Sequence, residues 1–118
     1  MTYKSRSFIM SAPFDEAWLR LGLSDKDLLD LQERLSDDPQ VGQVIPGTGG
    51  LRKLRISLSG KGKRGGARVV YVDFVIVETI YLFYVYGKNE QENLTETDKK
   101  DYKVLIAKLE STLVQKKE

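Results

Sequence analysis

The stretch ARVVYVDFVIVETIYLFYVY, residues 67–86, decides the fold of this 118-residue chain. β-Branched and aromatic residues dominate the stretch, and this composition is typical of β-strands. We predict two strands, Ala67–Phe74 and Thr79–Tyr86, joined by a short turn. That turn contains no Gly, Asn or Pro, so its type cannot be assigned. Asp73 and Glu78 interrupt the apolar run, which therefore predicts no membrane-spanning helix.

A further strand precedes this pair, because the hydropathy alternates from Leu51 onward. Leu54 and Ile56 would face one side of a sheet, and Lys53 and Arg55 would face the other side. The links between the successive strands are short, so we expect antiparallel pairing.

Apolar residues at helical spacing flank these strands on both sides and predict three helices. The stripes are Phe14, Trp18 and Leu21; Leu28, Leu31 and Leu35; and Tyr102, Leu105, Ile106, Leu109 and Leu113. Gly22 separates the first two helices. Ser24 with Asp27, and Thr95 with Asp98, resemble capping boxes at the starts of the second and third helices.

Together these elements predict one α+β domain, residues 1–118, without repeats or linkers. We expect an N-terminal helical hairpin, a C-terminal helix and a twisted, mainly antiparallel sheet of about four strands. Tyr3–Ile9 would be the short first strand, and Val41–Gly50 would be a loop that enters the sheet. The helices are expected to pack on one face of the sheet.

The composition excludes several kinds of site. The chain contains no cysteine and no histidine, which removes disulfides, thiolate metal sites, the commonest zinc ligand and the Ser-His-Asp triad. We therefore expect neither a metal nor another cofactor. The N-terminus lacks the apolar run of a secretory signal. These features predict a soluble cytoplasmic protein.

Positive charge is concentrated in one segment, although the net charge is only +2. Residues 52–68 contain no acidic residue, and they carry Arg52, Lys53, Arg55, Lys61, Lys63, Arg64 and Arg68. Such a segment indicates an anionic partner, or else a loop that its charge keeps solvated. The glycine-rich loop Ser59–Gly66 lacks the spacing of a nucleotide-binding P-loop, and we interpret it as a mobile basic flap.

The strand pattern places some of these cations near tyrosines. Lys53 and Arg55 are two residues apart and project from the same side, and Arg68 opens the next strand. Tyr84 and Tyr86 lie on the strand after it. Cations that hold phosphates and aromatic rings that stack on unpaired bases suit single-stranded RNA. Alternatively, Tyr84 and Tyr86 are ordinary sheet residues with solvated hydroxyls, and for Tyr84 we favour this interpretation.

Three segments in this order resemble the RelE/HigB toxin superfamily, and the HigB-type branch most of all. They are PGTGGLRKLR at 46–55, GKGKRGGARVVY at 60–71 and YGKNE at 86–90. The resemblance extends roughly from Val44 to Leu109, and the helical hairpin before it also suits the family.

This resemblance implies a ribosome-dependent mRNA interferase of a type II toxin–antitoxin system. Such toxins cleave translated mRNA by attack of the RNA's own 2′-hydroxyl on the adjacent phosphate. They use Lys, Arg and Tyr rather than a pair of histidines, which agrees with the composition of this chain. The implied partners are mRNA on the ribosome and a cognate helix-turn-helix antitoxin that neutralises the toxin.

The resemblance also implies site residues. Lys53 and Arg55 match the family's basic pair, one of which would act as base or stabilise charge. Arg68 matches the arginine that binds the phosphate and stabilises the pentacoordinate state. Lys88 lies in the last functional segment and is alternatively a plain surface lysine. The expected RNA-binding residues are Arg52, Lys61, Lys63, Arg64, Tyr86 and Asn89.

Two other functions remain open from the sequence. A ParE-like toxin would inhibit a protein such as gyrase by binding, and an RNA-binding domain would hold RNA without cutting it. The apolar stripe of the last helix is a candidate antitoxin-docking surface, unless it packs on the sheet.

Overall fold

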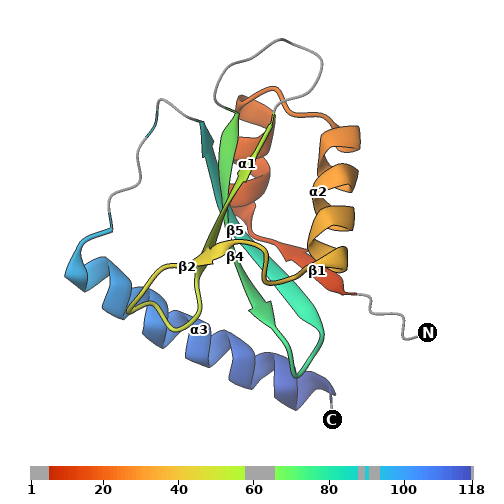
Figure 1. Cartoon of the computed structure of the whole chain (residues 1–118). Helices are drawn as coiled ribbons and strands as arrows, with labels where there is room; N and C mark the ends of the chain where they lie inside the picture. Colours follow the sequence, from red (N-terminus) through yellow and green to blue (C-terminus); the bar gives the residue numbers. More distant parts are fainter. Residues whose placement is uncertain (1–5, 58–65, 88–89, 91–93, 118) are drawn as a thin grey trace.

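The computed structural model of the chain describes residues 6–57, 66–87, 90 and 94–117. Within these residues, five strands form one sheet in the order β1-β5-β4-β3-β2, accompanied by helices α1, α2 and α3 (Figure 1). The elements are β1 Ser7–Met10, α1 Ala12–Arg20, α2 Asp25–Asp37, β2 Gln43–Val44, β3 Arg52–Ile56, β4 Ala67–Phe74, β5 Thr79–Gly87 and α3 Glu96–Lys117.

The sheet is mainly antiparallel, as predicted. Strands β2, β3, β4 and β5 pair antiparallel in sequence order, and β1 joins the outer edge of β5 in parallel. The predicted α+β class is confirmed. The strand count is five rather than about four because the predicted loop Val41–Gly50 contains β2, whose two residues are too few for a periodic signal. The first strand begins at Ser7, and Tyr3 of the predicted strand lies outside the described residues.

Our prediction that all helices pack on one face of the sheet is wrong. Val69 and Tyr71 of β4 are buried with residues of α1 and α2, whereas Val70 and Val72 are buried in a second cluster with Ile106 of α3. Nearly every residue of β4 is buried, and a strand that is apolar on both sides needs cover on both faces. The sheet is therefore the middle layer of the domain.

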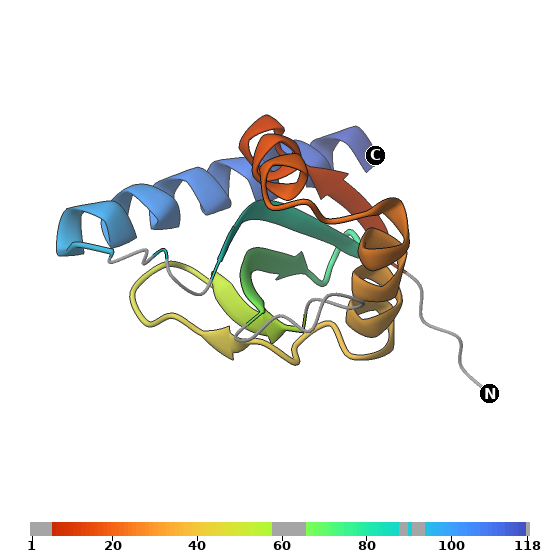
Figure 2. The same ribbon diagram turned by 90° about the horizontal axis from the view of Figure 1, so that it is seen from above.

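Helix α3 covers the second face alone and is the longest element (Figure 2). In the view from above it crosses most of the width of the molecule. None of the helices in the described part of the chain is long and apolar enough to cross a membrane.

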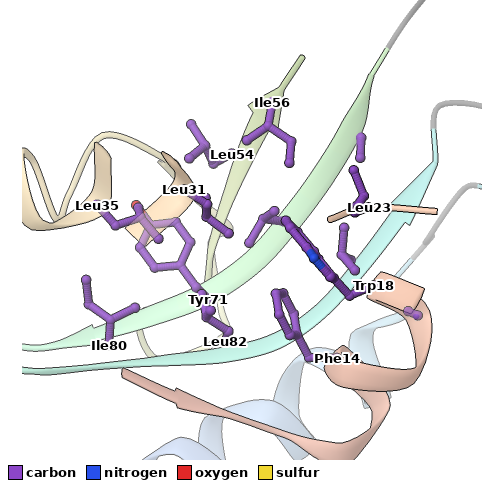
Figure 3. Packing of buried hydrophobic residues seen from close by; sticks show 14 residues of the cluster. Phe14, Trp18, Leu23, Leu31, Leu35, Leu54, Ile56, Tyr71, Ile80 and Leu82 are labelled. Carbon is purple, nitrogen blue, oxygen red and sulfur yellow. The ribbon is translucent and has the colours of Figure 1, made fainter. Parts of the chain in front are cut away.

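The first core cluster joins the helical hairpin to the sheet (Figure 3). Phe14 and Trp18 of α1 stack with ring centroids 5.3 Å apart. The indole N–H of Trp18 donates to the carbonyl oxygen of Ser24 at 3.1 Å, so the same side chain ties α1 to the start of α2. Ser24 and Asp27 form the predicted capping box, with both reciprocal hydrogen bonds present. The two helices thus pack on the sheet as one unit.

Tyr71 fastens β4 to the chain that leads into β2. Its buried hydroxyl donates to the carbonyl oxygen of Pro39 at 2.9 Å and accepts from the backbone N–H of Gly42 at 2.9 Å. Burial raises the pKa of the Tyr71 phenol above its ordinary value. A Cβ at position 42 would lie only 2.8 Å from the Tyr71 ring, so the close contact requires glycine there.

Tyr71→Phe is expected to lower the free energy of unfolding by about 2 kcal/mol, because it leaves a buried N–H and a carbonyl without their partner. Urea unfolding followed by circular dichroism measures this loss. Tyr81→Phe is the matched control, since the Tyr81 hydroxyl makes no hydrogen bond within the residues that the structure describes. Equal stability of the two variants would contradict the role assigned to the Tyr71 hydroxyl.

Candidate nucleic-acid interface

Three neighbouring strands bring predicted site residues into one row. Arg55 of β3 lies directly opposite Arg68 of β4, and Arg68 lies directly opposite Tyr86 of β5. Directly opposite residues on strands about 4.8 Å apart project from the same face. Lys53 lies two residues before Arg55 on that face, opposite Val70. The structure therefore brings together three cations and a tyrosine: Lys53, Arg55, Arg68 and Tyr86. We call these four residues the cation row.

A bulge in β5 places Tyr86 in this row. The register passes from Val70 opposite Tyr84 to Tyr71 opposite Leu82, which leaves Phe83 as an extra residue. One extra residue switches the sides of all following side chains. Phe83 and Tyr86 both belong to the core cluster that includes Ile106 of α3, although they are three residues apart along the strand. Regular alternation through Phe83 would have turned Tyr86 to the other face.

Two arginines of the row occupy directly opposite positions on neighbouring strands. Like charges directly opposite one another destabilise an antiparallel sheet, yet Arg55 and Arg68 occupy such a pair of positions. Arg55 is exposed and Arg68 is half-buried. Residues that oppose the local rules of stability are typical of functional sites. The Arg55–Arg68 pair is therefore suited to hold an anion, because a guanidinium binds a phosphate with two hydrogen bonds.

A pocket of about 240 Å³ adjoins the row between the sheet and the first turns of α3. Lys53 and Tyr86 belong to both the row and the pocket wall, and α3 contributes Lys99 and Tyr102. The remaining wall is apolar and consists of Ile45, Leu51, Val70 and Leu94. The sequence reasoning did not include Lys99 or Tyr102, because it did not place the last helix on the face that carries the cations.

Arg52 lies away from the row. It precedes Lys53 by one residue, so its side chain projects from the opposite face of β3. Its guanidinium donates to the carbonyl oxygens of Gln40 at 3.0 Å and Gly42 at 2.7 Å. Arg52 therefore holds the chain before β2, and the proposed site does not include it. The predicted residues Lys61, Lys63, Arg64, Lys88 and Asn89 lie outside the described residues.

Arg20 and Glu90 link α1 to the end of β5. Arg20 forms an ion pair with Glu90 at 2.9 Å and donates to the Tyr84 hydroxyl at 3.2 Å, which supports a structural explanation of Tyr84. The second carboxylate oxygen of Glu90 accepts from the backbone N–H of Gly87 at 3.0 Å, and the N–H of Glu90 donates to the Gly87 carbonyl. These bonds hold the chain just beyond Tyr86.

The Gly87 amide, followed by the Arg20 guanidinium, holds the pKa of the Glu90 carboxyl below its ordinary value of 4.5. Because the folded pKa is depressed, ionised Glu90 contributes its full stabilisation of the fold above the ordinary value of 4.5. This stabilisation is lost as the pH falls through the folded pKa. We expect the amide resonance of Gly87 to titrate with a midpoint below 4.5 in a pH series of NMR spectra. Arg20→Met should recover only part of the shift, since the Gly87 amide remains. A midpoint at or above the ordinary value would contradict the geometry.

Comparisons with known proteins agree with this fold. The sequence model of a family described as the RelE toxin of the RelE/RelB toxin–antitoxin system matches residues 13–117. A mutant of the E. coli toxin RelE in the free state superposes with a TM-score of 0.54 at 16% identity, over 73% of this chain and 85% of that one. The intact E. coli RelBE toxin–antitoxin complex gives 0.52 at 16% identity, over 74% of this chain and 100% of that one.

A mutant E. coli RelE in complex with an antitoxin peptide gives a TM-score of 0.51 at 16% identity, over 74% of this chain and 86% of that one. At these identities the structures establish a shared fold, and the family match covers nearly the whole chain. This chain belongs to the RelE toxin family and is the toxin of a toxin–antitoxin system.

Proposed function

We propose that this toxin is a ribosome-dependent endoribonuclease that cleaves translated mRNA and thereby inhibits translation. The observation that carries the proposal is the cation row, in which Arg55, Arg68 and Tyr86 stand side by side on three strands with Lys53 next to them. Four such side chains on one face can surround a single phosphodiester. The family match and the RelE-like fold support the same function.

In the proposed reaction, the 2′-oxygen of one nucleotide attacks the adjacent phosphorus and the bond to the 5′-oxygen of the next nucleotide breaks. The products are a 2′,3′-cyclic phosphate and a 5′-hydroxyl. Arg55 and Arg68 would stabilise the charge on the pentacoordinate phosphorus, because a guanidinium stays charged and offers bidentate hydrogen bonds. With no histidine in the chain, Lys53 and Lys88 are our candidates for proton transfer.

A cognate antitoxin would neutralise the enzyme. The similar E. coli toxin forms a complex with its antitoxin, and we propose a corresponding partner for this chain. We expect it to be a small helix-turn-helix protein encoded by the neighbouring reading frame. Co-expression with that protein should restore growth.

Primer extension on cellular mRNA after induction of the toxin tests the function. Discrete 5′ ends inside translated regions, carrying 5′-hydroxyls, are expected within minutes. Growth arrest with intact mRNA and DNA-damage signalling would instead identify a ParE-like inhibitor. RNA binding by the purified protein without new ends on translating ribosomes would identify a domain that binds and does not cut.

A further inference from the structure

The end of β5 that carries Tyr86 is flanked by a strand on one side only. Strand β1 pairs with β5 from Thr79 as far as Leu82. Within the residues that the structure describes, the last part of the strand, residues 84–87, is paired with β4 alone. This part also follows the bulge at Phe83, where the register changes. A strand end next to a bulge and at an open edge is the part of a sheet whose register is least constrained.

Two side chains outside the sheet restrain this strand end. One carboxylate oxygen of Glu90 accepts the backbone N–H of Gly87 at 3.0 Å, and the other accepts from the guanidinium of Arg20 at 2.9 Å. A second N–H of the guanidinium donates to the Tyr84 hydroxyl at 3.2 Å. The strand is thus contacted once before Tyr86 and once after it. We call Arg20 and Glu90 the edge clamp.

The edge clamp is anchored on α1, which packs directly against β5. Arg20 lies in the last turn of this helix, and Leu21 is the residue that caps it. A Cβ at Gly87 would lie 3.5 Å from the Cδ2 of Leu21, so the end of α1 and the end of β5 lie close together. Because Arg20 belongs to a helix that is itself packed on the sheet, the edge clamp ties the end of β5 to a fixed part of the core.

The edge clamp matters for position more than for stability. The side chains of Arg20 and Glu90 are 49% and 45% exposed, and exposed ion pairs contribute little to the stability of a fold. Tyr86, however, lies opposite Arg68 on the strand that the clamp contacts. In a catalytic site, a displacement of about 1 Å can lower the rate about a hundredfold. A small shift at the end of β5 would therefore affect catalysis while the domain stays folded.

We propose that Arg20 and Glu90 are positioning residues of the toxin, which keep Tyr86 level with Arg68 while a phosphodiester is bound at the cation row. The proposal rests on the RNA-cleaving function proposed above and extends the site to the end of α1. Both residues act through the strand rather than on the RNA. The alternative that the experiment must separate is a direct contact of Arg20 with an RNA phosphate.

Removal of either half of the edge clamp separates the two roles. Arg20→Met and Glu90→Ala are each expected to lower kcat for cleavage on translating ribosomes about tenfold with KM unchanged, because misplaced groups slow turnover rather than binding. If Arg20 bound RNA directly, Arg20→Met would raise KM, whereas Glu90→Ala would lower KM by removing a nearby negative charge. Effects of opposite sign in the two variants would overturn the proposal.

Two further variants complete the series. The double variant Arg20→Met, Glu90→Ala should lose hardly more activity than Glu90→Ala alone, because both changes remove one shared network. Glu16→Ala is the matched control and should cleave at the natural rate. Glu16 is an exposed carboxylate of α1 whose side chain makes no hydrogen bond or ion pair within the described part of the chain. Fully additive losses in the double variant, or a tenfold loss in Glu16→Ala, would contradict the edge clamp.

Amide hydrogen exchange, measured by NMR, tests the edge clamp without RNA. In Glu90→Ala the amides of residues 84–87 are expected to exchange about tenfold faster, because their edge loses its restraint. The amides of Thr79–Leu82, which β1 flanks, should keep their rates. Equal acceleration along the whole of β5, or no acceleration, would refute the proposal. A toxin that shows the expected exchange and leaves mRNA uncut would keep the edge clamp and lose the proposed nuclease function.

Discussion

Arg68→Ala is expected to reduce mRNA cleavage about a hundredfold to a thousandfold, the loss that follows removal of one preorganised charge-stabilising group. Arg68 stands at the centre of the cation row, with Arg55 opposite it on one side and Tyr86 on the other. The remaining groups cannot replace a bidentate guanidinium at that position. Quantitative primer extension on translating ribosomes measures the rate, and growth after induction gives an independent readout.

The same substitution should leave the fold intact. Arg68 is only half-buried and does not belong to either core cluster, so the melting temperature is expected to stay within a few degrees of the natural protein. Arg68→Lys keeps the positive charge and loses the bidentate hydrogen bonding of the guanidinium, so an intermediate cleavage rate is expected. Lys26→Ala, at an exposed position of α2 that has only a surface ion pair with Asp30, is the cation control and should cleave normally. Full toxicity of Arg68→Ala would refute the assignment of Arg68.

Gly66→Ala is expected to lower the free energy of unfolding by about 3 kcal/mol, through left-handed backbone strain and overpacking together. Gly66 has φ +63°, and a Cβ there would collide with the backbone carbonyl of Ile56. Backbone atoms cannot move aside as the end of a side chain can. The substitution must therefore separate β3 from β4 close to the Arg55–Arg68 pair, and activity should fall together with stability.

Gly22→Ala isolates the steric part of this effect. Gly22 has a similar φ of +75°, but a Cβ there would have nothing within 4 Å. We expect this control to lose only about 1 kcal/mol, the cost of the left-handed conformation alone. Thermal and urea unfolding of both variants measure the difference. Equal losses would mean that contact with Ile56 does not constrain the start of β4.

Local signals in the sequence were sufficient for most of the elements. The strand β4 has the predicted bounds, and Thr95 and Asp98 exchange the hydrogen bonds of the predicted cap. The turn after β4 could not be assigned because Glu78, a residue with no turn preference, adopts φ +51° there. The period-two pattern also placed Lys53 and Arg55 on one side. Applied to Arg52, the same pattern would have assigned it to the opposite face.

Other parts of the site depended on contacts between distant residues. The bulge at Phe83 turns Tyr86 toward Arg68, and it produces no signal in an unbroken aromatic strand. The placement of α3 on the second face brings Lys99 and Tyr102 to the pocket, and a helix's own stripe cannot indicate which face it will cover.

The sequence by itself determined where most of the helices and strands form and which cations share a side of β3, because hydrogen bonding and side-chain direction repeat over two to four residues. Only the tertiary structure decided the five-stranded order, the parallel pairing of β1 and the helix on each face. Those choices depend on burying both faces of β4 at once. The free energy of this burial comes from contacts between distant segments, so no single segment predicts it.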